Sequence, residues 1–564
     1  MLELLSKSVK NHFRYLLSLI LTLGSYFTIV FWRMLSISSN GLYAGHEHVW
    51  SDWSFHVAIA NIFAFKSPEH WFSYHPLYAG GKFTYPFLTD MVSGIMMRFG
   101  LSIEYSFFFP SVILAVVLIA GLYFLFYLLT DSKKISVVAV FIFFLSAGLG
   151  FIDLLRDLWQ NPSWSLFLYS ARDYGRFNIY QWYAGNMAVG LMVPQRAFLI
   201  GTALGVWAIA GTLFVILREH LLSKKLKIKI LVTAGVLAGI LPIAHAHSFI
   251  AVVAVTGLLC LVNFSAEGGS ASGGKKWRML WPYVITAGII SSVLYMIFIS
   301  GGIENKSFFQ WHPGYTADGD FFDWLRMWSL LWGVMPPIAI YGLYANRRII
   351  GKSRLAIYIA ATTLFAIGNL YLFQPIAWDN SKIFWWVYLI FSAPTAMALG
   401  NLWSRRYLLL KMASIIFFVF LTFLGFVELM KLIQTDKHEY QMTGIEDINL
   451  GLKIRASTDP LDVFLTAPSH NHFVMVWGLR PILMGYTAWV WNFGFDYNTT
   501  EMDMKRMYLG GDGTKDLLKK YDISYVVIGP TEIYDLSANE KYFSENFSLA
   551  FRNNNYRIYD TRSF

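Results

Sequence analysis

Several residue types are scarce in this chain of 564 residues, and each scarcity excludes a class of protein. Cysteine occurs once, at Cys260, which excludes a disulfide scaffold, a zinc–cysteine site and an iron–sulfur cluster. Charged residues make up only 14% of the chain, against about 25% in an average soluble protein. There is no Walker A loop, no G-x-G-x-x-G fingerprint, no H-E-x-x-H pair and no nucleophile elbow. ATP hydrolysis, nicotinamide chemistry and zincin proteolysis therefore have no sequence support.

Apolar and aromatic side chains are abundant instead. Hydrophobic residues make up 56% of the chain, aromatic residues 18%, and the mean hydropathy is +0.47. This composition excludes intrinsic disorder, and it excludes a soluble globular enzyme over most of the length. We therefore predict a polytopic α-helical membrane protein.

Charge divides the chain into two parts. Residues 1–430 carry 49 charged side chains, about 11% of that stretch, whereas residues 431–564 carry 31, about 23%. The second density is that of an ordinary soluble domain. We predict a membrane domain over 1–430 and a small soluble domain over 431–564. The net charge of +10 comes from the first part, so it reflects membrane loops and not affinity for nucleic acid.

Eleven apolar runs are long enough, or nearly so, to cross a membrane. They lie near residues 15–35, 105–130, 135–152, 198–217, 229–246, 247–264, 279–299, 325–345, 355–374, 383–401 and 411–430. Region 84–100 is better explained as a re-entrant or interfacial helix, because Pro86, Asp90 and Arg98 interrupt it. Region 165–197 has room for one more span, so the expected count is 11 to 13 transmembrane helices.

The loops between these runs alternate in charge, and this alternation sets the orientation. One set, with the N-terminus, holds 20 Lys and Arg against 3 acidic residues, and the other holds 8 against 11. The basic set and the N-terminus are expected in the cytoplasm, and residues 265–274 there are expected to form a flexible linker. The other set begins with a long loop over 36–83. An odd number of spans then places the tail outside as well.

The tail has the pattern of a small α/β domain. Two short apolar runs, 462–467 and 523–529, end in turn residues as buried strands do. Residues 515–520 are expected to end a helix between them, and residues 557–560 to form a last edge strand. Because sites in α/β domains lie where strands end, the polar stretch after the first strand is a candidate region.

The first outer loop carries an acidic residue in a helical context. Asp52 and His56 are four residues apart, so a helix places them on one face. A carboxylate at a membrane surface can act as a general base or hold a cation. The alternative is structural: Asp52 or its neighbour caps a helix that runs through Phe65. A further hypothesis is a divalent-cation site, for magnesium or manganese, at Asp52 with His46 and His48.

Cationic and imidazole side chains occur at the outer ends of later spans. Arg196 lies on the outer side, where the positive-inside rule does not explain it. A phosphate partner and an acidic neighbour such as Asp173 are both open explanations. His245 and His247 lie at the tip of a tight hairpin, where phosphate binding, proton transfer and a structural role are all open. Without a third ligand the His-x-His pattern is only a weak indication of a metal site.

A short outer loop combines a carboxylate, an amide and an ammonium group. Asp379, Asn380 and Lys382 lie within four positions and are flanked by tryptophan and phenylalanine. Ionisable groups at the edge of a helical bundle are candidates for function. The alternative is a local ion pair between Asp379 and Lys382.

The tail contains a dense polar and aromatic stretch. His470, His472 and Arg480 precede an aromatic segment over 485–494. Aromatic faces and amides together suit sugars, whose C–H faces stack on tryptophan. The alternative is a hydrophobic surface that docks onto the membrane.

The layout and several short motifs resemble the GT-C superfamily of membrane glycosyltransferases, which use sugars linked to lipid phosphates. The motifs are Asp52-Trp-Ser-Phe-His56, Tyr85-Pro-Phe-Leu-Thr-Asp90 with Gly100, Trp378-Asp-Asn-Ser-Lys382, and Gly478-Leu-Arg480 with Gly485-Tyr486. The chain is most similar to the bacterial and archaeal branch of that superfamily. It lacks the Asp-Glu pair of the protein O-mannosyltransferases, since Trp53 follows Asp52, and the Trp-Trp-Asp signature of the oligosaccharyltransferases.

The resemblance implies an enzyme that moves a sugar from a polyprenyl phosphate to a lipid, glycan or protein acceptor on the outer side of the membrane. It implies Asp52 as general base on the acceptor hydroxyl, or as ligand of a divalent ion. Negative charge develops on the leaving phosphate, which needs cationic stabilisation. The expected donor-binding residues are Lys382, Arg196, His245, His247, Asp379 and Asn380. The expected acceptor or sugar contacts are His56, His470, His472 and Arg480.

Two other functions fit the same hydropathy. A transporter or flippase predicts broken helices, polar groups at mid-membrane and repeat symmetry, and no repeat is evident. A non-catalytic scaffold for envelope assembly predicts that Asp52 and Lys382 can be lost without functional effect.

Overall fold

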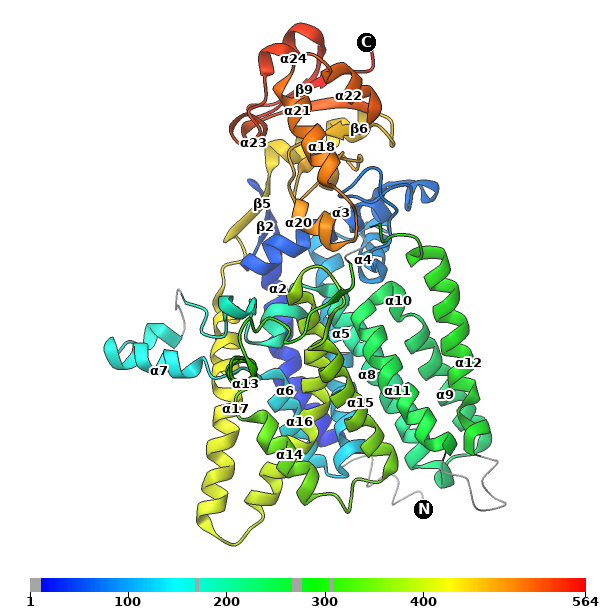
Figure 1. The fold of residues 1–564 in the computed structure, drawn as a ribbon, viewed down its shortest axis with the longest axis vertical. Helices are drawn as coiled ribbons and strands as arrows, with labels where there is room; N and C mark the ends of the chain where they lie inside the picture. The colour runs from blue at the N-terminus through cyan, green and yellow to red at the C-terminus, as the bar shows by residue number, and fades with distance from the viewer. Residues whose placement is uncertain (1–11, 168–171, 266–275, 305–307, 564) are drawn as a thin grey trace. The chain divides into compact units, whose positions relative to one another are not determined.

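The computed structural model describes residues 12–167, 172–265, 276–304 and 308–563 (Figure 1). The expected linker at 265–274 lies outside these residues, apart from Ser265. The chain divides into two compact units. What we call the helical unit comprises the chain up to Trp32, Ser111–Met296 and Gln310–Thr435, and the mixed unit comprises Arg33–Pro110, Ile297–Phe309 and Asp436–Phe564.

Eight described helical segments are long and apolar enough to cross a membrane, so the chain is a polytopic membrane protein. They are His12–Met34, Ile103–Thr130 (α5), Arg196–Leu217 (α8), Lys224–Ala244 (α9, Lys224–Gly239, and α10, Leu241–Ala244), Ala246–Asn263 (in α11, Ala246–Ser265), Met279–Ile299 (in α12, Lys276–Leu294, and the π-helical turn after it), Ala377–Trp403 (mostly α16, Ser381–Trp403) and Leu408–Gln434 (α17). Each of the eight coincides with one of the apolar runs in the sequence.

The other three expected spans take shorter forms. The run near 135–152 contains α6 (Lys133–Phe144), and the run near 355–374 contains α15 (Lys352–Gly368). The run near 325–345 is divided into α13 (Phe321–Trp332) and α14 (Met335–Ala345). The break falls at Gly333, whose φ of 59° interrupts the helical backbone. A full span needs about 17–25 residues, so α6, α13 and α14 are each too short by themselves, and α15, with 17 residues, is at the lower limit.

The two regions of doubtful hydropathy contain no spanning helix in their described parts. Region 84–100 contains α4 (Leu88–Arg98), which has 11 residues. Region 165–197 contains only short 3₁₀ and π-helical turns where the structure describes it. The described residues of region 165–197 therefore do not form the additional span considered there.

Helix α16 forms the core of the helical unit. Of its spanning window 89% is buried inside the protein, against 6% for Met279–Ile299. Helix α16 packs against α6, α11, α14, α15 and α17, whereas α9 and α12 run side by side (Figure 1). Polar residues on α16 therefore face protein, and ionisable residues in such positions usually serve binding or catalysis.

Two sheets organise the mixed unit. The first is antiparallel, in the order β1 (Leu35–Ser38), β2 (Gly41–Ala44) and β5 (Tyr440–Gly444), so the tail pairs directly with the start of the loop over 36–83. The second has the order β6 (Val463–Leu465), β7 (Ile523–Ile528), β9 (Arg557–Asp560) and β8 (Ser548–Arg552). Strands β6 and β7 are parallel, and the other pairs are antiparallel.

Apart from the 19-residue α3 (Glu47–Phe65), the helices of the mixed unit are short. The short ones are α4, α18 (Ile445–Ser457), α19 (Phe473–Val476), α20 (Thr487–Asn492), α21 (Asn498–Leu509), α22 (Thr514–Lys520), α23 (Pro530–Tyr534) and α24 (Glu540–Asn546). The tail thus has the expected α/β character. One detail is wrong: residues 557–560 form an inner strand, because Ile558 and Tyr559 are buried, and the mostly exposed β8 is the edge.

Candidate functional site

Buried polar side chains gather in the helical unit where α8, the α10–α11 turn and α16 meet. Nδ1 of His245 lies 2.8 Å from the Ser248 hydroxyl and accepts the Ser248 backbone N–H at 3.1 Å. Trp386 on α16 donates its indole N–H to the same hydroxyl at 3.0 Å. Gly201 on α8 permits this approach, because a Cβ there would lie 2.4 Å from the His245 Cβ.

The two histidines of the hairpin are neighbours and both are buried. The ring centroids of His245 and His247 are 5.6 Å apart. Neither Nε2 atom has a hydrogen-bond partner among the described residues. Since Nδ1 of His245 accepts a backbone N–H, its Nε2 carries the proton in the neutral form. Lys382 lies near enough to act electrostatically on both rings.

The loop that leads into α16 holds an ion pair and a buried amide. Lys382 Nζ pairs with the Asp379 carboxylate, and both side chains are largely buried. The local-pair interpretation is therefore confirmed. Asn380 accepts the Phe373 N–H at 2.9 Å and donates to two backbone carbonyl oxygens, at 2.7 and 3.0 Å. Its amide is engaged with the backbone, so Asn380 holds the loop in place.

Arg196 is fully buried at the first position of α8. A buried guanidinium has five N–H donors and no acceptor, so it requires carbonyl or anionic partners. Aromatic rings pack around the start of α16 in the same unit: the Trp182 ring centroid is 5.3 Å from that of Trp378 and 5.8 Å from that of Trp385. The helical unit thus combines cations, imidazoles and aromatic rings.

In the mixed unit, α3 carries Asp52 in its interior. The helix begins at Glu47, and its N-cap is His46, whose Nδ1 accepts the His48 N–H at 3.3 Å. Asp52 lies in the second turn and is half-buried. The alternative in which Asp52 caps the helix is therefore wrong, although the helix does end at Phe65.

The proposed metal ligands do not converge. Among the described residues, no three His, Cys, Asp or Glu side chains are placed to hold a metal ion. Nδ1 of His46 serves the cap, and burial, reinforced by the neighbouring His48, lowers the pKa of His46 to about 3. His48 Nε2 lies 3.9 Å from Glu47. The set of His46, His48 and Asp52 does not fit a divalent cation.

A buried histidine–carboxylate pair lies one turn after Asp52. His56 Nδ1 is 2.7 Å from Asp90 Oδ2, and the two residues are 2% and 1% exposed. The bond joins α3 to α4 across 34 positions and fixes the orientation of the His56 ring. Asp90 was absent from the expected site residues. The available signal was the single carboxylate of this short helix.

The expected sugar contacts in the tail have different environments. The His470 ring centroid lies 4.6 Å from that of Trp50 and 5.6 Å from that of Trp489, and burial lowers the pKa of His470 to about 4. Arg480 donates to the Thr458 hydroxyl and to the carbonyl oxygens of Arg455 and Thr458. Its guanidinium therefore ties down the end of α18.

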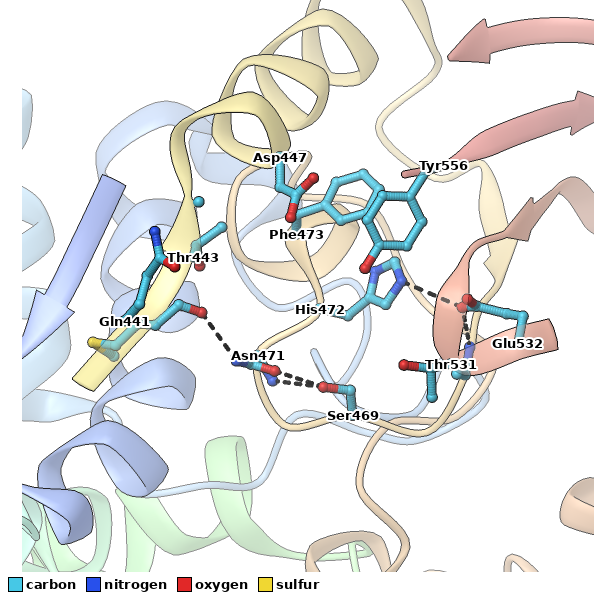
Figure 2. A pocket seen from close by; sticks show the side chains of 13 residues that line it. Gln441, Thr443, Asp447, Ser469, Asn471, His472, Phe473, Thr531, Glu532 and Tyr556 are labelled. Carbon is cyan, nitrogen blue, oxygen red and sulfur yellow. Dashed lines mark hydrogen bonds and ion pairs between the residues drawn. The ribbon is translucent and has the colours of Figure 1, made fainter. Parts of the chain in front are cut away.

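His472 lies elsewhere, on a polar pocket of the tail with a volume of about 210 Å³ (Figure 2). Its Nε2 lies 3.7 Å from Glu532, the buried acid of α23. Sequence reasoning missed Glu532. The available signal was its position just after the end of β7, where sites of α/β domains are found.

Comparison with known proteins gives a fold but no close relative. No protein-family model matches the sequence, and no curated protein matches it significantly. Among solved structures, the chain is similar to the Archaeoglobus fulgidus oligosaccharyltransferase tethered to an acceptor peptide containing the NVT sequon. The identity is 11% and the TM-score 0.55, over 92% of this chain and 69% of that one. For the same enzyme in complex with Zn and sulfate, the identity is 11% and the TM-score 0.55, over 96% of this chain and 73% of that one.

A second similar protein is ArnT from Cupriavidus metallidurans bound to undecaprenyl phosphate. The identity is 11% and the TM-score 0.50, over 97% of this chain and 98% of that one. At such identities the likeness concerns the fold. The chain has the fold of these two proteins, the GT-C fold that the sequence motifs had indicated.

Proposed function

We propose that this chain is a glycosyltransferase that moves a sugar from a polyprenyl-phosphate donor to an acceptor on the outer side of the membrane. The fold supports this function, since similar structures contain undecaprenyl phosphate in one case and an acceptor peptide in another. The observation that carries the proposal is the cluster of the buried His245 and His247 with the largely buried Lys382 in the helical unit.

The cluster suits a lipid phosphate. A buried polar atom almost always has a hydrogen-bond partner, so the Nε2 atoms of His245 and His247 are positions that a ligand would satisfy. The protonated Nε2 of His245 can donate to a phosphate oxygen. Lys382 and Arg196 supply positive charge, while Asp379 pairs with Lys382 and Asn380 holds its loop. This positive charge stabilises the phosphate as it leaves.

Acceptor activation is assigned to α3. Asp52 removes the proton of the acceptor hydroxyl as that oxygen bonds to the anomeric carbon of the sugar. The bond between the anomeric carbon and the phosphate oxygen breaks, and its electron pair remains on the polyprenyl phosphate. His56, held by Asp90, fixes the face of α3 on which Asp52 lies, and His470 and His472 contact sugar.

The donor site is tested by binding of undecaprenyl phosphate to the purified protein. Lys382→Met should weaken binding by about tenfold or more, because a buried cation is removed from the phosphate. Lys382→Arg keeps the charge and should bind more tightly than Lys382→Met. Lys224→Met, at an exposed position of α9, is the matched control.

Loss of Lys382 also leaves Asp379 buried without its partner, which destabilises the protein. The double variant Asp379→Asn/Lys382→Met removes both charges and separates binding from stability. If the folded double variant bound undecaprenyl phosphate as tightly as the parent, the phosphate site would lie elsewhere.

The orientation is part of the proposal: a cytoplasmic N-terminus and an extracytoplasmic tail. Ser537 is exposed in the tail. A Ser537→Cys variant in a Cys260→Ser background should react with a membrane-impermeant thiol reagent in intact cells. Labelling that requires permeabilisation would reverse the orientation.

A further inference from the structure

The pocket lined by His472 belongs to the tail alone. Its walls come from β5 and the start of α18, the loop before α19, the start of α23 and the residue that precedes β9 (Figure 2). Transfer as proposed above leaves this pocket without a role beyond one sugar contact at His472. Its volume of about 210 Å³ is below the range of about 300–1,000 Å³ for drug-sized ligands, which points to a small ligand.

A buried carboxylate forms the floor of the pocket. Glu532 is 0% exposed, and its Oε1 accepts the Ala467 N–H at 2.9 Å. Its Oε2 has no hydrogen-bond partner among the described residues. Burial raises the pKa of Glu532, but His472 and the backbone donors outweigh this and hold the pKa below its usual value. Glu532 is therefore ionised at neutral pH and offers an acceptor to a ligand.

His472 has a defined tautomer. Its Nδ1 accepts the Val474 N–H at 3.3 Å and caps α19, so Nε2 carries the proton in the neutral form. Nε2 is directed toward Glu532 at 3.7 Å (Figure 2). That separation is too long for a good hydrogen bond, so a ligand hydroxyl could bridge the two side chains.

An aromatic ring forms one wall. The Tyr556 ring centroid lies 4.8 Å from that of Phe473 and 6.1 Å from that of His472. Gly529 permits the placement of Tyr556, because a Cβ there would lie 2.2 Å from the Tyr556 ring. A flat, partly exposed ring next to hydrogen-bonding groups suits a ligand that has both C–H faces and hydroxyls.

The charge of the pocket selects against anions. Two carboxylates, Asp447 and Glu532, line it, and none of its lining residues is Lys or Arg. Burial raises the pKa of Asp447 above its usual value. A phosphate or a sugar acid would meet a desolvated negative charge at Glu532, which costs free energy. A neutral polyhydroxylated ligand would not.

We infer that this pocket binds one neutral saccharide unit, stacked on Tyr556 and hydrogen-bonded through its hydroxyls to Glu532, His472 and Asp447. The inference rests on the proposed function, because that function is what brings saccharides to the protein. It assigns a saccharide ligand to the tail. The sugar is the terminal unit of the acceptor or of the growing product. Binding at this pocket requires no transfer chemistry.

Saturation-transfer NMR on the full-length protein in detergent tests the inference with the methyl glycosides of glucose, mannose, galactose and N-acetylglucosamine. At least one should bind. Tyr556→Leu, Asp447→Asn and Glu532→Gln should each weaken it by about tenfold, the size expected for loss of a charged hydrogen bond or a stacked ring. Asp512→Asn, which removes an exposed carboxylate of the tail, is the matched control and should not change binding.

Glu532→Gln could also loosen the fold, since it removes the partner of His472, so Asp447→Asn and Tyr556→Leu carry the test in that case. The methyl glycoside of galacturonic acid should bind at least about tenfold more weakly than that of galactose. The inference is overturned if no glycoside binds, if the folded variants bind as tightly as the parent, or if the uronic acid binds equally well.

Failure of the proposed enzymatic function gives a different experimental result from failure of the saccharide pocket. Asp52→Asn removes the proposed base and should leave glycoside binding unchanged. Glycoside binding in a protein that transfers no sugar would refute the enzymatic proposal and leave the pocket intact. Sugar transfer by a protein that binds no glycoside would refute the saccharide pocket and leave the enzymatic proposal intact.

Discussion

Lys66, just beyond the end of α3, is a buried cation whose ionisation should control the stability of the mixed unit. It is 6% exposed, and its Nζ donates to the Tyr74 hydroxyl at 2.9 Å and to the Pro460 carbonyl at 3.2 Å. Burial, and then the charge of Arg480, lower the pKa of Lys66 to about 7. An unfolded lysine has a pKa of about 10.4.

The direction of this pH dependence follows from the number of protons that the folded and unfolded states bind. Between pH 7 and pH 10 the unfolded chain binds a proton at Lys66 that the folded protein has released, so raising the pH stabilises the fold. Below pH 7 both states are protonated, and the full cost of burying the charge is present. From pH 9 to pH 6 the contribution of Lys66 should therefore fall by about 3 kcal/mol.

Lys66→Met removes this titration. Thermal unfolding can be followed by intrinsic tryptophan fluorescence from pH 6 to pH 9. The Tm of the variant relative to that of the parent should rise by several degrees as the pH falls. Lys453→Met, at an exposed position of α18, is the control and should follow the parent. If the difference in Tm between Lys66→Met and the parent stayed constant over this range, the desolvation argument would be wrong.

Three further substitutions test the remaining contacts. Asp52→Asn should lower the transfer rate by about 10²–10⁴-fold, because it removes the proposed general base. Since the proposed role is that of a base and not of a metal ligand, chelator should leave the parent rate unchanged. Near-parent transfer by the variant would remove Asp52 from catalysis. Asp90→Asn should destabilise the protein by about 2 kcal/mol, since it weakens a buried bond to His56, and an unchanged melting curve would contradict this. Gly201→Ala should weaken undecaprenyl phosphate binding, because the added methyl group displaces the α10–α11 turn; unchanged binding would show that the turn can yield without loss of the site.

The spans and the α/β character of the tail were predictable because they depend on local properties of the chain. A run of about 20 apolar residues is recognisable without its neighbours, and so is a short apolar strand that ends in a turn. Local geometry also placed Asp52 and His56 on one helix face. It failed where a local interaction decided otherwise, as at His46, which caps α3 in place of Asp52.

The sites were less predictable. The sequence suggested His245, His247 and Lys382 separately, each with open alternatives, and packing around α16 brought them into one buried cluster. The sequence likewise suggested Arg480 as a sugar contact, but the structure uses its guanidinium to bind the end of α18. One side chain can serve either role, and only its neighbours in space distinguish them.

The sequence alone determined that this chain crosses a membrane many times and ends in an α/β domain, because hydropathy and strand patterns are set by nearby residues. Tertiary structure alone decided the pairing of His56 with Asp90, of His472 with Glu532 and of β2 with β5. The partners in each case lie tens to hundreds of positions apart. No local pattern encodes such a pairing, because its free energy arises only when packing removes both groups from water together.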